Sequence, residues 1–317
     1  MAIVTGSRQT YDATEAIKES VEDIIYNISP TDTPFMNNAG RVNVQNTTFE
    51  WQTEALPSPS TTNKQPEAEE FTASTMVDTA RLANSCQISV RNAVVSGTQN
   101  VVSQYGKTTE MAHQLMLAAR ILKNDVEAAL VSANPRVSGS SGTARQTRAL
   151  EHWIVTNDTR GTGGAQAASE TAAMTDASSG NQVALAESAV ESLMQTIFTA
   201  GGEPDTIMCG PFNKRKISDF TGRANSRHMV DANVVTSNVT LYASDFGDLR
   251  VMVNRKQRDR TVFLLDFEYW KVAFLRPFTR QDIAKVGDSD REQLIVEFGL
   301  QSSQESGSGA IFDRTTS

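Results

Sequence analysis

The stretch that decides the fold runs from Arg41 to Val95 and reads RVNVQNTTFEWQTEALPSPSTTNKQPEAEEFTASTMVDTARLANSCQISVRNAVV. Both flanks alternate apolar and polar side chains, as β-strands do, and the apolar members are Val42, Val44, Phe49, Trp51, Leu82, Cys86, Ile88 and Val90. The middle, from Pro57 to Glu70, is acidic, contains three prolines and has no such period. A two-stranded ribbon alone in water cannot bury one face or satisfy its outer backbone edges. We therefore expect this ribbon to rest on another molecule.

The composition is that of a soluble protein with enough apolar residues for a core. The chain has 317 residues, of which 39% are hydrophobic and 21% charged, which allows two ordinary domains or one domain with long extensions. A net charge of −8 and a pI near 5.1 argue against a general nucleic-acid or membrane-surface binder. No apolar run approaches the roughly 20 residues that span a bilayer, and the first six residues lack signal-peptide features. Synthesis in a reducing cytoplasm is the simplest inference.

Three segments have the periodicity of amphipathic helices. The first covers residues 12–28, and the third covers residues 184–200 and ends at a Gly-Gly pair. The strongest pattern covers residues 108–132, and its apolar side chains recur every three or four positions, at Met111, Leu115, Ala118, Leu122, Val126 and Ala129. At 1.5 Å per residue this helix is roughly 37 Å long. It is long enough to brace a whole domain.

The second half of the chain turns from loop to β-structure. Residues 157–182 are rich in Gly, Ala, Ser and Thr and predict a flexible surface loop. Gly210-Pro211 opens a short helix that runs through Phe220. Alternating or continuous apolar runs predict strands at 206–209, 249–253, 262–265 and 294–300. The helices and strands together predict an α+β fold.

The residues that could carry chemistry lack the spacing that a site needs. They are Cys86, Cys209, His113, His152, His228, the glycine run 161–164, Asp288 and Asp290. The two cysteines are far apart and fit buried thiols, and the histidines are not clustered as in a metal site. The glycine run lacks the lysine of a phosphate-binding loop, and the aspartates lack further oxygen ligands at loop spacing. We therefore predict no catalytic, cofactor-binding or metal-ligating residues and no cofactor.

Charge is unevenly distributed along the chain. Residues 213–260 hold ten Lys or Arg against five acids, whereas the first hundred residues hold twelve acids against six bases. Such polarity suits head-to-tail contacts between copies, because opposite fields steer and register docking. Two unrelated solvated faces are the alternative explanation.

Several motifs follow one another in a specific order. They are Asn27-Ile-Ser-Pro-Thr-Asp-Thr-Pro-Phe35, Thr48-Phe-Glu-Trp51, Val95-Ser-Gly-Thr98 before the long helix, Asp245-Phe-Gly-Asp-Leu-Arg250 leading to Val253-Asn-Arg255, a hairpin from Leu264-Leu-Asp266 to Leu275-Arg-Pro277, and Ala284-Lys-Val-Gly-Asp288. In this order they resemble the major head, or major capsid, proteins of tailed double-stranded DNA bacteriophages, which have the Hong-Kong-97-type shell fold. The resemblance covers roughly residues 12–312.

The resemblance implies a division of the chain. The implied parts are an N-terminal arm at 1–40, an extended β-hairpin loop at 41–97, a peripheral domain at 98–203 with its spine helix at 108–132 and its flexible loop at 157–182, an axial domain at about 204–260, and closing β segments at 261–317 that both domains share. The extended loop would lie over a neighbouring subunit, which explains an arm that has no core of its own.

The resemblance also implies a structural function and no enzyme activity. Copies of the chain would form hexamers and pentamers of an icosahedral head around the phage genome, in the virion, after synthesis in the host bacterial cytoplasm. The implied partners are the chain itself, scaffolding, portal and decoration proteins, and packaged double-stranded DNA through weak non-specific contact, with no membrane. A non-viral nanocompartment shell of the same fold and a hydrolytic enzyme are the alternatives.

Overall fold

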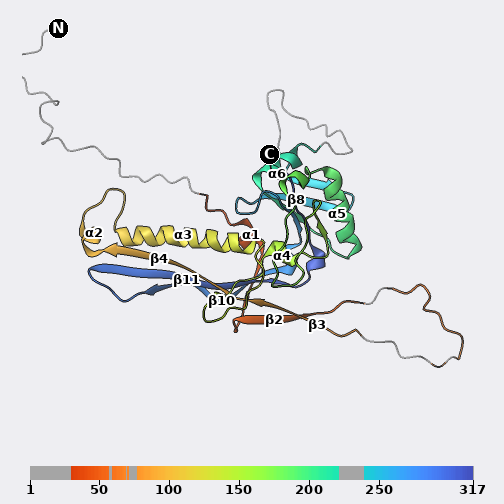
Figure 1. The fold of residues 1–317 in the computed structure, drawn as a ribbon, viewed down its shortest axis with the longest axis horizontal. Coiled ribbons are helices and arrows are strands. Elements are labelled where there is room, and N and C mark those ends of the chain that lie inside the picture. Colours follow the sequence, from red (N-terminus) through yellow and green to blue (C-terminus); the bar gives the residue numbers. More distant parts are fainter. Residues whose placement is uncertain (1–29, 57–58, 69, 71–76, 221–238, 317) are drawn as a thin grey trace, which may run out of the picture.

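The computed structural model describes residues 30–56, 59–68, 70, 77–220 and 239–316, which form two sheets and a separate ribbon (Figure 1). The elongated sheet has the strand order β1-β10-β11-β4, with bounds Gly40–Asn43, Trp270–Asp282, Ser289–Ser302 and Gln87–Ser96. The six-stranded sheet has the order β5-β12-β9-β6-β8-β7, with bounds Asp158–Thr159, Gly309–Ile311, Val262–Leu265, Thr206–Cys209, Gly247–Val253 and Leu241–Ser244. The ribbon pairs β2 (Thr48–Thr53) with β3 (Ala80–Ser85). The predicted α+β class is confirmed.

The long helix α3 spans Glu110–Leu130 and lies along the elongated sheet, in contact with β4 and β11 (Figure 1). Its buried apolar side chains are Met111, Ala118, Leu122, Val126 and Leu130, and they form the stripe that the 3.6-residue period requires. The helix predicted at 108–132 is therefore confirmed, with both ends two residues shorter.

Shorter helices connect and cover the sheets. They are α1 (Pro34–Asn38), α2 (Gly97–Val101), α4 (Leu150–Trp153), α5 (Glu187–Thr199) and α6 (Pro211–Ser218). Helix α5 contacts β12 and α6 contacts β8, so both belong to the six-stranded sheet. Helix α5 ends where Gly201 adopts a positive φ of 90°, as the Gly-Gly stop predicts. The helix predicted at 12–28 lies outside the residues that the structure describes.

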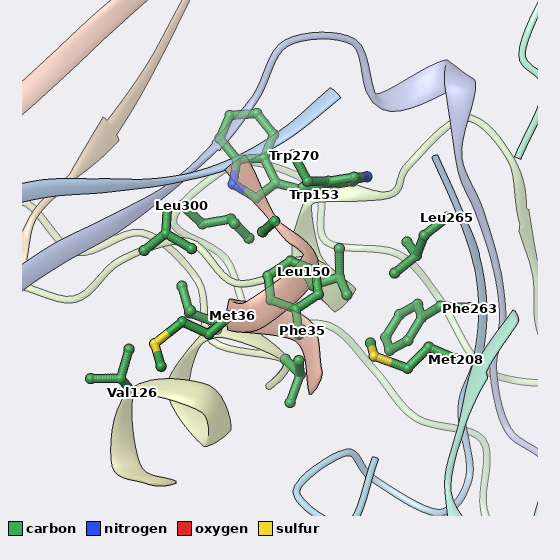
Figure 2. Close-up of a cluster of buried hydrophobic side chains, with 14 of the residues drawn as sticks. Phe35, Met36, Val126, Leu150, Trp153, Met208, Phe263, Leu265, Trp270 and Leu300 are labelled. Carbon is green, nitrogen blue, oxygen red and sulfur yellow. The ribbon is translucent and has the colours of Figure 1, made fainter. Parts of the chain in front are cut away.

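One apolar cluster joins the two sheets (Figure 2). Helix α1 supplies Phe35 and Met36, β10 supplies Trp270, and β9 supplies Phe263 and Leu265 from the six-stranded sheet. Each of these large side chains contributes about 1.5–3 kcal/mol when it is fully buried. Because the cluster is continuous, we expect the two sheets to unfold in one transition.

A single buried carboxylate ties three distant segments together beside this cluster. Glu127 of α3 is fully buried and accepts hydrogen bonds from the backbone N–H of Phe35 and of Met36, each at 2.8 Å. It also accepts one from Nδ2 of Asn254, just after β8, at 2.7 Å. Burial raises the pKa of Glu127, and the three hydrogen bonds oppose that shift. The carboxylate thus fixes α1 and the end of β8 against α3.

Two details of the strand arrangement differ from the sequence-based expectation. Within the range 41–97, only about residues 48–85 leave the elongated sheet, because β1 pairs with β10 and β4 pairs with β11. The hairpin predicted between Leu264-Leu-Asp266 and Leu275-Arg-Pro277 is wrong. Strand β9 pairs with β6 and β12, and β10 forms its hairpin with β11. All four residues of β9 are buried, and such a strand needs a neighbour on both edges and cover on both faces.

Residues 157–182 have more fixed contacts than their composition predicted. Strand β5 pairs with β12, and both carboxylate oxygens of buried Asp313 accept backbone N–H groups of this segment, from Gly161 at 3.2 Å and from Ala177 at 3.0 Å. A carboxylate more than a hundred residues away in sequence therefore anchors the segment that was predicted to be flexible.

A second buried carboxylate lies at the junction of α4 with the loop before β9. Glu151 is fully buried, accepts a hydrogen bond from Oγ1 of Thr261 at 3.1 Å, and lies 3.5 Å from Nη1 of Arg258. Arg258 and Arg260 in turn pair with Asp176, at 2.7 and 3.1 Å. Burial raises the pKa of Glu151 to about 7, because the charge of Arg258 offsets only part of the desolvation.

Replacing Glu127 by Ala should lower the free energy of unfolding by about 3 kcal/mol or more, because three buried donors lose their acceptor. The control is Asp125→Ala on the same helix, which removes a half-exposed ion pair with Arg91 at 2.7 Å and should cost at most about 1 kcal/mol. Urea unfolding of the dissociated subunit, followed by circular dichroism, measures both. Equal losses would contradict the role given to Glu127.

Replacing Glu151 by Gln should remove a pH dependence of stability. Because the folded-state pKa is about 7 and that of an unfolded Glu is about 4.3, the folded state binds more protons in between, and stability falls as pH rises through this window. We expect little effect of Glu151→Gln at pH 5, but a gain on the order of 3 kcal/mol at pH 8. Urea unfolding at both pH values measures this. The exposed control Glu50→Gln should change stability by less than about 1 kcal/mol at either pH, and a gain for Glu151→Gln that does not depend on pH would contradict the assignment.

Candidate assembly interface

The root of the β2–β3 ribbon is anchored to the body of the subunit through one of its two faces. In the antiparallel register, Phe49 lies opposite Asn84 and Trp51 opposite Leu82, so these four side chains share a face. Trp51 stacks on Phe49, with ring centroids 5.6 Å apart, and packs at a tilt against Trp153, with ring centroids 5.5 Å apart. The face therefore carries the aromatic side chains that the alternation in the sequence predicted.

Hydrogen bonds fix the same root. The indole Nε1 of Trp51 donates to the carbonyl of Ser302 at 2.8 Å, and Nδ2 of buried Asn84 donates to the carbonyl of Leu300 at 2.6 Å. Phe49 also lies where a Cβ on Gly299 would be, since such an atom would stand 2.6 Å from Cε1 of the ring. A side chain at position 299 would displace Phe49. The ribbon therefore leaves the subunit at a fixed point.

The ribbon's other face and its outer segment have no such anchor. On the opposite face, Glu50 and Arg81 form an exposed ion pair at 3.4 Å. Beyond the strands, every residue that the structure describes between 54 and 79 is exposed, including Leu56, which is 90% exposed. A segment that buries nothing in its own subunit, and that includes an exposed leucine, suits contact with another molecule.

Further apolar side chains are exposed along the elongated sheet and at its far end. On β4, Ile88, Val90 and Val94 alternate on the face turned away from α3 and are 45%, 39% and 58% exposed. At the end farthest from α5 (Figure 1), Val101 ends α2 and Val102 follows it, and both are exposed. The N–H of Gly97 in α2 donates to the carbonyl of Asp288 at 3.1 Å. The apolar side chains of β4 lie together on one face of the strand, and exposed apolar groups that adjoin one another mark surfaces for contact with other molecules.

The cysteines and His152, which are residue types that could carry chemistry, are buried in the fold. Cys86 and Cys209 are buried free thiols, and burial raises the pKa of Cys86 to about 11, so the prediction of buried thiols is confirmed. His152 lies in α4, accepts a hydrogen bond at Nδ1 from Nε of Arg148 at 2.9 Å, and has its Nε2 2.8 Å from the carbonyl of Ala172. Its pKa is lowered, chiefly by burial, so the neutral ring acts as a packing residue.

The other candidates do not form a site either. His113 lies on α3, and His228 is outside the residues that the structure describes. Asp290 pairs with Lys285 at 2.5 Å and accepts a hydrogen bond from Asn100 at 2.9 Å. Over the ranges that the structure describes, no group of three or more His, Cys, Asp or Glu could hold a metal ion. Within the same ranges, no helix is long and apolar enough to cross a membrane.

The basic stretch 213–260 is partly neutralised within the subunit. Arg258 and Arg260 are paired with Asp176, and Arg250 donates to Oδ1 of Asn38 at 3.1 Å. Exposed Arg215 and Arg255 have no ion pair in the part of the chain that the structure describes. The sequence could not show this difference, because the partners of the paired bases are distant in the chain.

Comparison with solved structures identifies the fold. The overall fold matches the capsid asymmetric unit of cyanophage A-1(L) with a TM-score of 0.69, at 13% identity, over 95% of this chain and 98% of that chain. It also matches the capsid of a native GTA particle with a TM-score of 0.62, at 13% identity, over 98% of this chain and all of that chain. The fold is thus the Hong-Kong-97-type shell fold that the sequence motifs implied.

The family follows from sequence. The model of the SU10 major capsid protein family matches residues 3–315, and the chain therefore belongs to this family. The major capsid protein of Escherichia phage Phieco32 is 26% identical over 319 residues, which cover 90% of this chain and 91% of that protein. The resemblance to phage head proteins is confirmed, and the family is one of structural capsid proteins rather than of enzymes.

Proposed function

We propose that copies of this major capsid protein form the hexamers and pentamers of an icosahedral head around the phage genome. The observation that carries the proposal is the ribbon, which is anchored by Phe49, Trp51 and Asn84 but is fully exposed in its outer segment. An element held so firmly at one end and buried nowhere at the other suits contact between subunits. The free edges of β1 and β4 in the elongated sheet offer further surface for such contacts.

The parts of the subunit have different roles in this proposal. The ribbon and its outer segment act as the extended loop over a neighbouring subunit, and α3 with the elongated sheet acts as the peripheral domain. The six-stranded sheet with α5 and α6 acts as the axial domain around the five-fold and quasi-six-fold axes. Of the closing strands, β10 and β11 lie in the elongated sheet and β9 and β12 in the six-stranded sheet, which suits a C-terminal segment shared by both domains.

The partners in this proposal are other copies of the chain, scaffolding and portal proteins, decoration proteins, and the packaged DNA. The chain itself carries out no catalysis, since its buried His, Cys and Glu side chains are used in packing. A chain with a net charge of −8 suits weak contact with phosphate rather than sequence-specific binding.

The proposal predicts that the outer part of the loop is needed for assembly but not for folding. Replacing residues 57–70 by a short Gly/Ser turn removes no buried residue of either sheet, so the variant should keep a cooperative thermal transition. At micromolar concentration the full chain should form capsomers, tubes or shells, whereas the variant should stop at monomers or capsomers. Circular dichroism and analytical ultracentrifugation measure both properties.

Two outcomes of this experiment would count against the proposal. Closed shells of normal size from the loop variant would show that the loop is dispensable. A full chain that stays a sharp 34.5 kDa species would argue against self-assembly altogether.

The proposal also predicts weak, salt-sensitive binding of DNA. Isolated capsomers should bind two unrelated duplexes equally, and the binding should disappear as salt rises to about 200 mM, because it depends on a few contacts with phosphate. Fluorescence anisotropy with both duplexes over a salt series measures this. Tight binding of one sequence at physiological salt would contradict the shell function.

A further inference from the structure

A groove of about 390 Å³ lies where α1, β1, α3 and β10 meet. The side chains that matter for its chemistry are Met36, Arg41, Lys123, Phe274 and Phe278. Phe274 and Phe278 have ring centroids 6.3 Å apart and form an aromatic wall, and Phe278 is 40% exposed. The groove lies beside β1, which is an edge strand of the elongated sheet.

The charge of the groove is entirely positive. Arg41 and Lys123 are both exposed, and no acidic side chain lines the groove. Within the described part of the chain, neither cation has an ion-pair partner. Two unpaired cations beside exposed aromatic rings suit an occupant that brings carboxylates together with a flat apolar group.

The outer segment of the extended loop carries both carboxylates and a flat apolar ring. Pro66, Glu67 and Ala68 form an exposed turn, in which Ala68 has a positive φ of 67°, and Glu70 follows it. Glu67 and Glu70 are exposed and have no ion-pair partner among the described residues. The turn thus presents a proline ring followed by two exposed carboxylates, which have no ion pair within the described residues.

The turn cannot reach the groove of its own subunit. Figure 1 shows the ribbon β2–β3 and its outer segment extending away from α1 and α3. The anchors at Trp51 and Asn84 fix the direction in which the ribbon leaves. If this turn occupies the groove, it therefore comes from a second copy.

We propose that the groove at Arg41 and Lys123 receives the Pro66-Glu67-Ala68 turn of a neighbouring subunit. Glu67 and Glu70 pair with the two cations, and Pro66 packs on the rings of Phe274 and Phe278. Each exposed pair is weak, but each subunit repeats it and the charges set the register of docking. The proposal rests on the role of the extended loop in assembly and adds the surface that receives it.

The test is charge reversal with rescue in the full chain. Arg41→Glu combined with Lys123→Glu should raise the protein concentration needed for assembly at least tenfold. Adding Glu67→Arg and Glu70→Arg in the same chain should restore assembly to within about twofold, because the pairs form again with opposite sign. The measurement is light scattering and electron microscopy over a concentration series, after circular dichroism has shown that each variant is folded.

A matched control lies on the same helix. Arg120 is also exposed on α3, one turn before Lys123, and does not line the groove. Arg120→Glu changes the net charge as Lys123→Glu does, so it should leave the assembly concentration within about twofold of the wild type, whereas Lys123→Glu alone should raise it.

The outcomes separate this inference from the proposed function. If the groove reversal leaves assembly unchanged while the loop variant still fails to assemble, the groove is not the docking surface, although the loop remains necessary. If the reversal blocks assembly and Glu67→Arg with Glu70→Arg does not restore it, another occupant, such as residues 1–29 or a separate protein, uses the groove, and the inference is overturned.

Discussion

The carboxylate of Glu127 is the constraint on which the arrangement of the subunit depends. It is buried, and a buried carboxylate is tolerated only when enough donors surround it. Here the donors come from α1 and from Asn254, just after β8. The carboxylate keeps its donors only if α1 and the end of β8 are both packed against α3. The apolar cluster around Phe35 and Trp270 stabilises this arrangement, whereas the hydrogen bonds to Glu127 fix how α1 and the end of β8 are oriented on α3.

What could be predicted from the sequence was local. The stripe of α3, the continuous apolar run of β9 and the Gly-Pro start of α6 are all encoded within a few residues, and the structure has each of them. The hairpin predicted from Leu264 to Pro277 failed because the choice of strand partner depends on burial on both faces, which no short window contains. The anchoring of residues 157–182 by Asp313 escaped prediction for the same reason.

The surfaces proposed for assembly were also only partly predictable from the sequence. Alternation at Phe49 and Trp51 indicated a strand with one apolar face, and the proline-containing middle indicated a segment without a core. The partners of that face, Trp153 and Ser302, are brought in by the fold, as are the four elements that form the groove at Arg41 and Lys123. The sequence therefore indicates that the ribbon needs a partner surface, but the position of that surface depends on the three-dimensional fold.

The continuous core around Phe35 has a mechanical consequence. Helix α3 has 21 residues and is about 32 Å long. It contacts β4 and β11, in a sheet whose strands β10 and β11 have 13 and 14 residues and are therefore longer than the helix. If such a unit rotated about a point near α1, a rotation of about 10° would move its far end by about 5–6 Å. Small rotations of whole subunits would therefore displace the far ends of α3 and the elongated sheet by several ångströms while each core keeps its packing.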